Sequence, residues 1–186
     1  MLVSPDIEAV CQAVRLGGVI AYPTEAVFGL GCDPNNASGT ALLLQIKQRS
    51  FEKGLILIAA DFEQLRPFLA ADITPTAQQM TPAPVTWIFP AHPDVSPLLT
   101  GGRNTLAVRV SRHPQVQSLC SQLQHPLTST SANLSGLEPC KSTQQVIDQF
   151  IHHHPALAAV LDGPTGGQLN PTEIRDSISG KILRHS

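Results

Sequence analysis

Residues 19–33 read VIAYPTEAVFGLGCD, and their first four positions form a short apolar run that predicts a β-strand over Val19–Tyr22. Pro23 lacks the N–H group that a sheet ladder needs, so we expect the strand to end and a loop to follow. The loop carries two glycines and the polar side chains of Thr24 and Glu25. Because ligands bind outside the strand ends of open α/β sheets, this loop is a candidate pocket wall. A plain turn with its glycines at positive φ is the alternative.

Strand-length apolar runs and helical patterns alternate along the rest of the chain. Strands are predicted at 55–60, 85–89, 105–110, 127–129 and 160–162, and helices at 4–16, 39–48, 61–69, 114–123 and 143–152. The first helix is expected to be capped by Ser4, with Pro5 at its first position, and the 61–69 helix by a capping box of Asp61 and Gln64. A hairpin is predicted from 172–177 and 181–184. The alternation indicates a layered α/β fold with a mostly parallel or mixed sheet.

The composition fits one globular domain spanning residues 1–186. Hydrophobic residues make up 42% of the chain and charged residues 14%, which argues against disorder. The net charge of -2 gives no overall attraction to nucleic acid, so any RNA contact must be local. Neither a signal peptide nor a membrane-spanning apolar stretch is recognisable, which leads us to expect a soluble, cytoplasmic protein.

The cysteines and histidines give no metal-ligand pattern. The four cysteines are far apart in the sequence, so we expect free thiols that fill the core: Cys11, Cys32, Cys120 and Cys140. Three consecutive histidines at 152–154 are expected on a solvated helix end. No P-loop and no dinucleotide-binding glycine pattern occurs in the chain.

Three further segments carry polar groups suited to anions. Residues 47–53 contain three cations, which could bind phosphates or could form a solvated basic helix end. Residues 128–136 are rich in hydroxyl and amide groups, which could bind phosphate or carboxylate oxygens or form an ordinary polar turn. Arg109 interrupts an apolar strand, so it must meet either an internal carboxylate or a ligand anion.

Taken together and in order along the chain, five motifs resemble those of the YrdC/TsaC family of threonylcarbamoyl-AMP synthases. They are YPTEAVFGLGCD at 22–33, K-x-R-x-x-x-K-x-L-I-L at 47–57, LAVRV at 106–110, STSAN-x-SG at 129–136 and NPTEIRD at 170–176. The resemblance covers nearly the whole chain. It implies a twisted, open mixed α/β sheet with flanking helices around a large concave cavity lined by positive charge.

The resemblance also implies an activity. Members convert L-threonine, bicarbonate or CO2, and ATP to threonylcarbamoyl-AMP and pyrophosphate, so the chain is expected to be an ATP-dependent nucleotidyltransferase of tRNA modification. The product feeds a tRNA threonylcarbamoyl-transfer complex that modifies the adenosine next to the anticodon. Mg²⁺ is expected with ATP, without a tightly bound cofactor or a protein metal site. The alternative is a non-enzymatic module that binds tRNA or double-stranded RNA or acts in ribosome maturation.

Site residues follow from the motif positions. The residues implied to hold threonine are Thr24, Arg109, Ser129 and Thr172. Those implied to hold ATP and its phosphates are Lys47, Arg49, Lys53, Thr105, Ser131, Asn133 and Arg184. No residue is assigned as a catalytic acid or base, because the reaction needs two anions brought together and a leaving pyrophosphate stabilised.

Two positions depart from the family pattern. Ser50 stands where a proline is usual, so the loop before Lys53 is expected to be less rigid. Residues 80–84 replace a segment that contains glycine, and Ala83 would be strained if that glycine has a positive φ.

Overall fold

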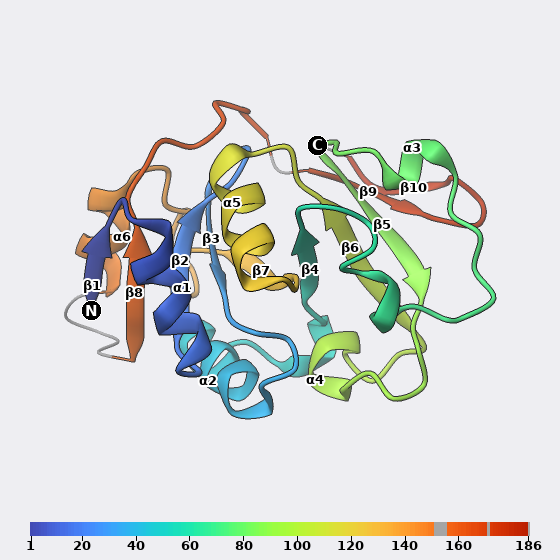
Figure 1. The fold of residues 1–186 in the computed structure, drawn as a ribbon, viewed down its shortest axis with the longest axis horizontal. Helices are drawn as coiled ribbons and strands as arrows, with labels where there is room; N and C mark the ends of the chain where they lie inside the picture. Colours follow the sequence, from blue (N-terminus) through green and yellow to red (C-terminus); the bar gives the residue numbers. More distant parts are fainter. Residues whose placement is uncertain (151–155, 171, 186) are drawn as a thin grey trace.

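The computed structural model describes residues 1–150, 156–170 and 172–185, and it shows a mixed ten-stranded sheet with helices against both faces (Figure 1). The strands are β1 (Leu2–Ser4), β2 (Val19–Pro23), β3 (Phe28–Gly31), β4 (Ile56–Ala59), β5 (Val85–Pro90), β6 (Thr105–Val110), β7 (Leu127–Ser131), β8 (Leu157–Leu161), β9 (Glu173–Asp176) and β10 (Ile182–Arg184). Their order in the sheet is β1-β8-β2-β3-β7-β4-β6-β5-β9-β10. The sheet contains both parallel pairs, such as β4 with β6, and antiparallel pairs, such as β3 with β7. The predicted fold class is therefore confirmed.

The helices are α1 (Ile7–Arg15), α2 (Ala37–Lys47), α3 (Ala77–Met80), α4 (Pro97–Thr100), α5 (Pro114–Leu123) and α6 (Thr143–Phe150), with short 3-10 turns η1 (Phe51–Lys53) and η2 (Arg66–Phe68). In Figure 1, α1 and α5 lie side by side in front of the sheet, where they contact β2. α2 also contacts β2, and α6 contacts β8. Among the described residues, no helix has the length and apolar character needed to cross a membrane.

The core consists of two apolar clusters, and successive residues of β2 belong to different clusters. Ile20 and Tyr22 pack with the buried residues of α1 and α5, whereas Val19 and Ala21 pack with those of α2. Side chains alternate across a strand, and each face of β2 is covered by one of the clusters, so every residue of β2 is buried. This explains why its sequence is continuously apolar. The four cysteines are also buried, as predicted.

The predicted loop after β2 contains a strand, so its plain-turn alternative is wrong. β3 pairs antiparallel with β2, and the N–H of Thr24 donates to the carbonyl of Val27 at 3.1 Å to close the hairpin. Neither Gly29 nor Gly31 has a positive φ. Their role is close approach: a Cβ on Gly31 would lie 2.1 Å from the carbonyl oxygen of Thr128 on β7.

Other boundaries differ from the prediction for local reasons. Ser4 ends the unpredicted edge strand β1, and Asp6 caps α1 by accepting from the N–H of Glu8 at 3.0 Å. Only half of the predicted capping box forms: the N–H of Gln64 donates to Asp61, but the Gln64 side chain accepts from the N–H of Ala60. No α-helix follows, since Pro67 lacks the N–H that an interior helical position must donate. Residues 152–154, the histidine triple, lie outside the described residues.

The end of α5 gives a stability prediction. Its C-cap Gln124 has φ 62 and ψ 19, a left-handed conformation that glycine adopts without steric cost. Replacing Gln124 with glycine is expected to raise the free energy of unfolding by about 0.5–1 kcal/mol. As a matched control, Ser118→Gly on the exposed side of the same helix should lower it by roughly 0.5–1 kcal/mol. Chemical denaturation of both variants measures the difference, and a destabilised Gln124→Gly would contradict the prediction.

Candidate functional site

A cavity of about 230 Å³ lies where the β2–β3 hairpin, β7, β6 and the C-terminal hairpin meet. Its polar wall is made by seven of the predicted site residues: Thr24, Arg49, Arg109, Ser129, Ser131, Thr172 and Arg184. All four residues predicted for threonine are among them. The structure thus gathers side chains that are up to 160 positions apart in the sequence, from Thr24 to Arg184.

Arg109 is the buried cation of this cavity, and the structure supplies the internal carboxylate that was one of its two predicted partners, while the ligand anion stays a prediction. Its Nη2 lies 3.5 Å from Oε2 of Glu25, which is the internal carboxylate. Its Nη1 donates to Oγ1 of Thr172 at 3.1 Å, and the side chain lines the cavity. The Nε atom is buried without a hydrogen-bond partner in the structure. Arg109 is therefore paired yet retains donor capacity for an anion.

Glu25 is charged despite its burial. Its Oε1 accepts a hydrogen bond from Oγ of Ser111 at 2.6 Å. Burial raises the pKa of the Glu25 carboxyl, but the Arg109 guanidinium and the Ser111 hydroxyl outweigh it, so the pKa lies below its ordinary value. The cavity wall therefore contains Arg109, whose charge is compensated by Glu25 behind it, and two further arginines, Arg49 and Arg184.

Lys47 is buried at the end of α2, so the solvated helix end considered from the sequence is wrong for this residue. Its Nζ donates at 2.7 Å to three oxygens, the carbonyls of Ser131 and Asn133 and the side-chain Oδ1 of Asn133. Burial and the nearby Arg49 lower the pKa of Lys47 to about 8. Lys47 and Asn133 do not line the cavity itself, but they hold the loop after β7 that forms one of its walls.

The other two arginines are held by backbone carbonyls. Nη2 of Arg49 donates to the carbonyl of Gly54 at 3.1 Å, while its Nε is buried without a partner. Nη2 of Arg184 donates to the carbonyl of Thr172 at 2.7 Å. Burial lowers the pKa of both guanidinium groups, and Arg109 lowers that of Arg184 further. Fixed guanidinium groups of this kind suit carboxylates and phosphates.

Besides Lys47 and Asn133, two more predicted residues do not line the cavity. Lys53 is exposed at the end of η1, and Thr105 begins β6, four residues before Arg109. At roughly 3.3 Å per strand residue, that separation is about 13 Å. Ser50, the first departure from the family pattern, caps η1 by accepting from the N–H of Glu52 at 3.4 Å.

The second departure causes no strain. Ala83 is not among the described residues with positive φ, and its N–H donates to the carbonyl of Val110 at 3.1 Å. The expectation of a strained Ala83 is therefore wrong.

Sequence reasoning missed the apolar wall and the counter-ion. The cavity is also lined by Ala26, Val27, Phe28, Gly29, Ile56, Thr130 and Pro139. Residues 26–29, Ile56 and Thr130 lie inside the motifs and could have been expected, whereas Pro139 lies outside them. Glu25 lies in the motif too, but only the structure shows that it faces Arg109.

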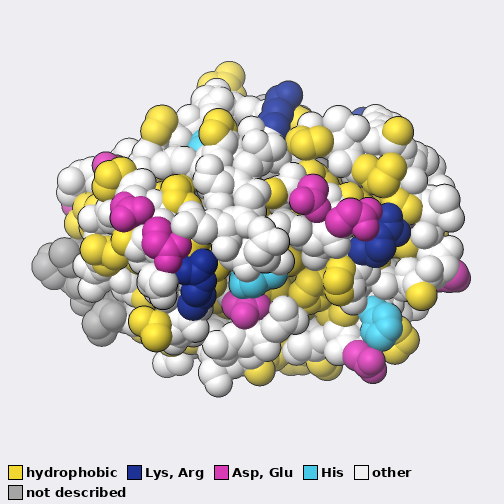
Figure 2. Space-filling model, viewed as in Figure 1, with side chains coloured by type: hydrophobic (Ala, Val, Ile, Leu, Met, Phe, Trp, Pro, Cys, Tyr) yellow, Lys and Arg dark blue, Asp and Glu magenta, His cyan; other side chains and the backbone are white. Residues whose placement is uncertain are grey.

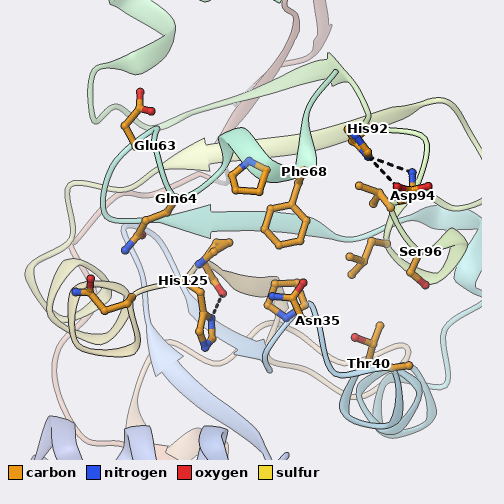
Figure 3. Close-up of a pocket in the computed structure, with 16 residues that line it drawn as sticks. Asn35, Thr40, Glu63, Gln64, Phe68, His92, Asp94, Ser96 and His125 are labelled. Carbon is orange, nitrogen blue, oxygen red and sulfur yellow. Dashed lines mark hydrogen bonds and ion pairs between the residues drawn. The ribbon is translucent and has the colours of Figure 1, made fainter. Parts of the chain in front are cut away.

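A larger hollow of about 590 Å³ lies elsewhere (Figure 3). Phe68 points into its centre, with His125 and His92 on different sides. Its lining, as far as the structure describes it, includes Glu63 and Asp94 but no lysine or arginine. Its charge is thus wrong for the anions that the motifs predict, and we take the smaller cavity as the functional site.

The described residues contain no group of three or more His, Cys, Asp or Glu side chains that could hold a metal ion. The donors of the smaller cavity are instead guanidinium and hydroxyl groups over an apolar floor. Chemically, this arrangement can bind and orient a small carboxylate beside a phosphorylated compound.

Comparisons with known proteins point in one direction. The Sua5/YciO/YrdC family model, described as "Telomere recombination", matches residues 12–186. The chain is 52% identical over 184 residues to a threonylcarbamoyl-AMP synthase from Photobacterium profundum, covering 96% of this chain and 98% of that protein. It is 55% identical over 180 residues to the protein of the same name from Serratia proteamaculans, covering 94% and 93%.

Solved structures agree on the fold. P. abyssi Sua5 complexed with L-threonine superposes with a TM-score of 0.86 at 27% identity, over 96% of this chain but only 53% of that one. The chain thus spans about half of the length of Sua5. E. coli YciO superposes with a TM-score of 0.79 at 27% identity, covering 99% of this chain and 93% of that one.

Proposed function

The chain belongs to the Sua5/YciO/YrdC family, and from this premise we propose that it is a threonylcarbamoyl-AMP synthase. The expectation from the motifs is confirmed by relatives of that name that match nearly its whole length. The observation that carries the proposal is the cavity, because it brings together Thr24, Arg109, Ser129 and Thr172, all four residues expected to hold threonine.

The proposed reaction has two stages. The amine of L-threonine takes up CO2 to give a carbamate, and a carbamate oxygen then attacks the α-phosphorus of ATP, which breaks the bond to pyrophosphate. This makes the chain a nucleotidyltransferase. Bicarbonate supplies the CO2 with loss of water. The adenylate would be consumed by a tRNA threonylcarbamoyl-transfer complex.

We assign roles by charge and position. Arg109 would bind the threonine carboxylate, with the hydroxyls of Thr172 and Thr24 beside it. Arg49 and Arg184 would face the phosphates, because they are the remaining cations that line the cavity. Lys47 would fix the Ser131–Asn133 loop through its three hydrogen bonds and add positive charge behind it. Mg²⁺ would arrive with ATP and neutralise its phosphates.

These roles make catalysis a matter of positioning and charge. Holding the two reactants together removes the entropic cost of their encounter, and fixed cations stabilise the departing pyrophosphate without reorganisation. No proton transfer from a protein acid or base is required at the phosphorus.

The RNA-binding alternative finds less support. Lys47, Arg49 and Arg109 are buried or turned into the cavity. Arg103 is engaged with the carbonyl of Glu52 at 2.7 Å. The face shown in Figure 2 carries its lysine and arginine side chains in small separate groups, without the continuous basic track that phosphate backbones favour.

The decisive assay is pyrophosphate release. With L-threonine, bicarbonate and Mg-ATP, the chain is expected to release pyrophosphate and form threonylcarbamoyl-AMP, identified by mass spectrometry. Omitting threonine, or chelating Mg²⁺ with EDTA, should abolish both. Pyrophosphate release that does not depend on threonine, or none with all substrates present, would rule out the proposed function.

The lowered pKa of Lys47 predicts a pH dependence. As the pH rises through about 8, the ammonium loses a proton and can no longer serve its three acceptors. We expect kcat/KM for ATP to be level near neutral pH and to fall roughly tenfold per pH unit above that pKa. Lys47→Arg, which stays charged, should keep a flat profile to about pH 9.5 at a lower rate. The same fall in both enzymes would show that another group titrates.

A further inference from the structure

Glu25 is a buried carboxylate beside the cavity that does not form part of its wall. Its Oε1 is fixed by two donors, Oγ of Ser111 at 2.6 Å and the N–H of Arg112 at 3.3 Å. Its Oε2 lies 3.5 Å from Nη2 of Arg109 and accepts no hydrogen bond. One oxygen therefore anchors the carboxylate, and the other faces the cavity's buried arginine.

The anchor joins segments that are distant in the sheet. Glu25 follows β2, whereas Ser111 and Arg112 follow β6, and β3, β7 and β4 lie between these two strands. The carboxylate thus ties the ends of strands from the two halves of the sheet. Because Arg109 belongs to β6, its guanidinium is fixed relative to Thr24, which adjoins Glu25.

The backbone carbonyls of Thr24 and Glu25 also hold the segment 163–170, which we call the strap and which leads from β8 toward β9. The strap's Gly166 and Gln168 donate their N–H groups to the carbonyls of Thr24 and Glu25, each at 2.9 Å. A Cβ on Gly166 would lie 3.0 Å from Cα of Glu25, so a side chain at this position would crowd the Glu25 backbone. The strap leads to Thr172, which accepts from Arg109.

The side chains form a continuous series of contacts: Glu25 faces Arg109, and Arg109 donates to Thr172. Between these two neighbours the guanidinium is held but not saturated. Its Nε has no partner, and its contact with Glu25 is longer than a close hydrogen-bonded pair. The two contacts leave donors of Arg109 for an incoming carboxylate while setting the plane in which they are presented.

We propose that Glu25 is a positioning residue for threonine: its carboxylate orients Arg109 so that the guanidinium and Thr172 meet the substrate carboxylate together. This inference rests on the proposed function and assigns Glu25 no contact with substrate. It predicts an effect mainly on threonine, because the two arginines that would face the phosphates are held by backbone carbonyls, Arg49 by that of Gly54 and Arg184 by that of Thr172, and not by the Glu25 carboxylate.

The test compares Glu25→Gln and Ser111→Ala with the unaltered chain in the pyrophosphate assay. Glu25→Gln keeps the shape but turns an amide or a neutral oxygen toward Arg109. We expect KM for threonine to rise roughly 10- to 100-fold, with KM for ATP and kcat within about threefold. Ser111→Ala keeps the charge of Glu25 but removes the hydroxyl donor to its Oε1. We expect KM for threonine to rise roughly 3- to 10-fold in this variant, again with little change in KM for ATP or in kcat. The control Glu63→Gln, in an exposed pair with Arg66, should change neither constant.

Calorimetric titration of L-threonine into the same proteins separates the possible outcomes. Threonine binding by the unaltered chain that Glu25→Gln and Ser111→Ala leave unchanged would overturn the positioning role and leave the proposed function standing. Equal losses for threonine and ATP would assign Glu25 a merely structural role, which also overturns it. An unaltered chain that neither binds threonine nor releases pyrophosphate would refute the proposed function and this inference with it. If Glu25→Gln does not fold, Ser111→Ala alone decides.

Discussion

Replacing Lys47 with methionine is expected to reduce threonine-dependent pyrophosphate release by about 100-fold or more. Methionine keeps the apolar stem but removes the charge and the donors to Ser131 and Asn133. Without them, the loop after β7 loses its anchor and the phosphates lose a fixed positive charge behind that wall. The loss should appear mainly in kcat, since a departing pyrophosphate needs this charge more than bound ATP does.

The same change is expected to cost stability. Three part-buried acceptors lose a donor, but an expensive buried charge disappears as well, so the free energy of unfolding should fall by only about 1–3 kcal/mol. Circular dichroism during denaturation measures this, and Lys181→Met, at an exposed turn, is the matched control. A folded Lys47→Met with normal turnover would remove Lys47 from the proposed mechanism.

Replacing Gly31 with alanine is expected to disrupt the fold itself. The added Cβ would lie 2.1 Å from the carbonyl oxygen of Thr128 and 3.0 Å from Cε1 of Tyr22. That carbonyl cannot retreat easily, because it accepts the hydroxyl of Tyr22 at 2.9 Å and belongs to a central strand. We expect a loss of more than about 3 kcal/mol, enough to deplete the soluble protein on expression.

Gly29, on the same strand and the same face, provides the contrast. A Cβ there would meet only side-chain atoms, the nearest at 3.3 Å, so Gly29→Ala should lose no more than about 1 kcal/mol. Since Gly29 lines the cavity, this variant should instead lose activity while staying folded. Thermal unfolding and the pyrophosphate assay together distinguish the two glycines, and equal stability of both variants would contradict the explanation by close approach.

The sequence was most informative where a pattern is periodic and self-contained. β6 and α5 begin and end at the predicted residues, because an apolar run and a proline-started amphipathic pattern mark their limits. β3 was missed because half of its residues are glycines, and their reason, a carbonyl on β7, is about 97 positions away. Local patterns carry no information on such contacts.

The candidate site shows the same limit. Motif positions identified seven residues of the cavity, because a resemblance to a family assigns roles to whole segments of the chain at once. They also included Lys53 and Thr105, which the fold keeps away from the cavity. The role of Glu25 depends on the register that places the end of β2 near the end of β6, and this pairing of strand ends is set by tertiary structure alone.

The edge of the sheet formed by β9 and β10 has a consequence for how such a protein can diversify. The residues of these two strands are only partly buried or exposed, yet Arg184 on β10, and Thr172 just before β9, reach the cavity. The proposed threonine and phosphate contacts therefore come partly from a segment that contributes little to the two apolar clusters. Mutations there can accumulate with little effect on folding, so this edge is where directed evolution toward other amino acids would best begin.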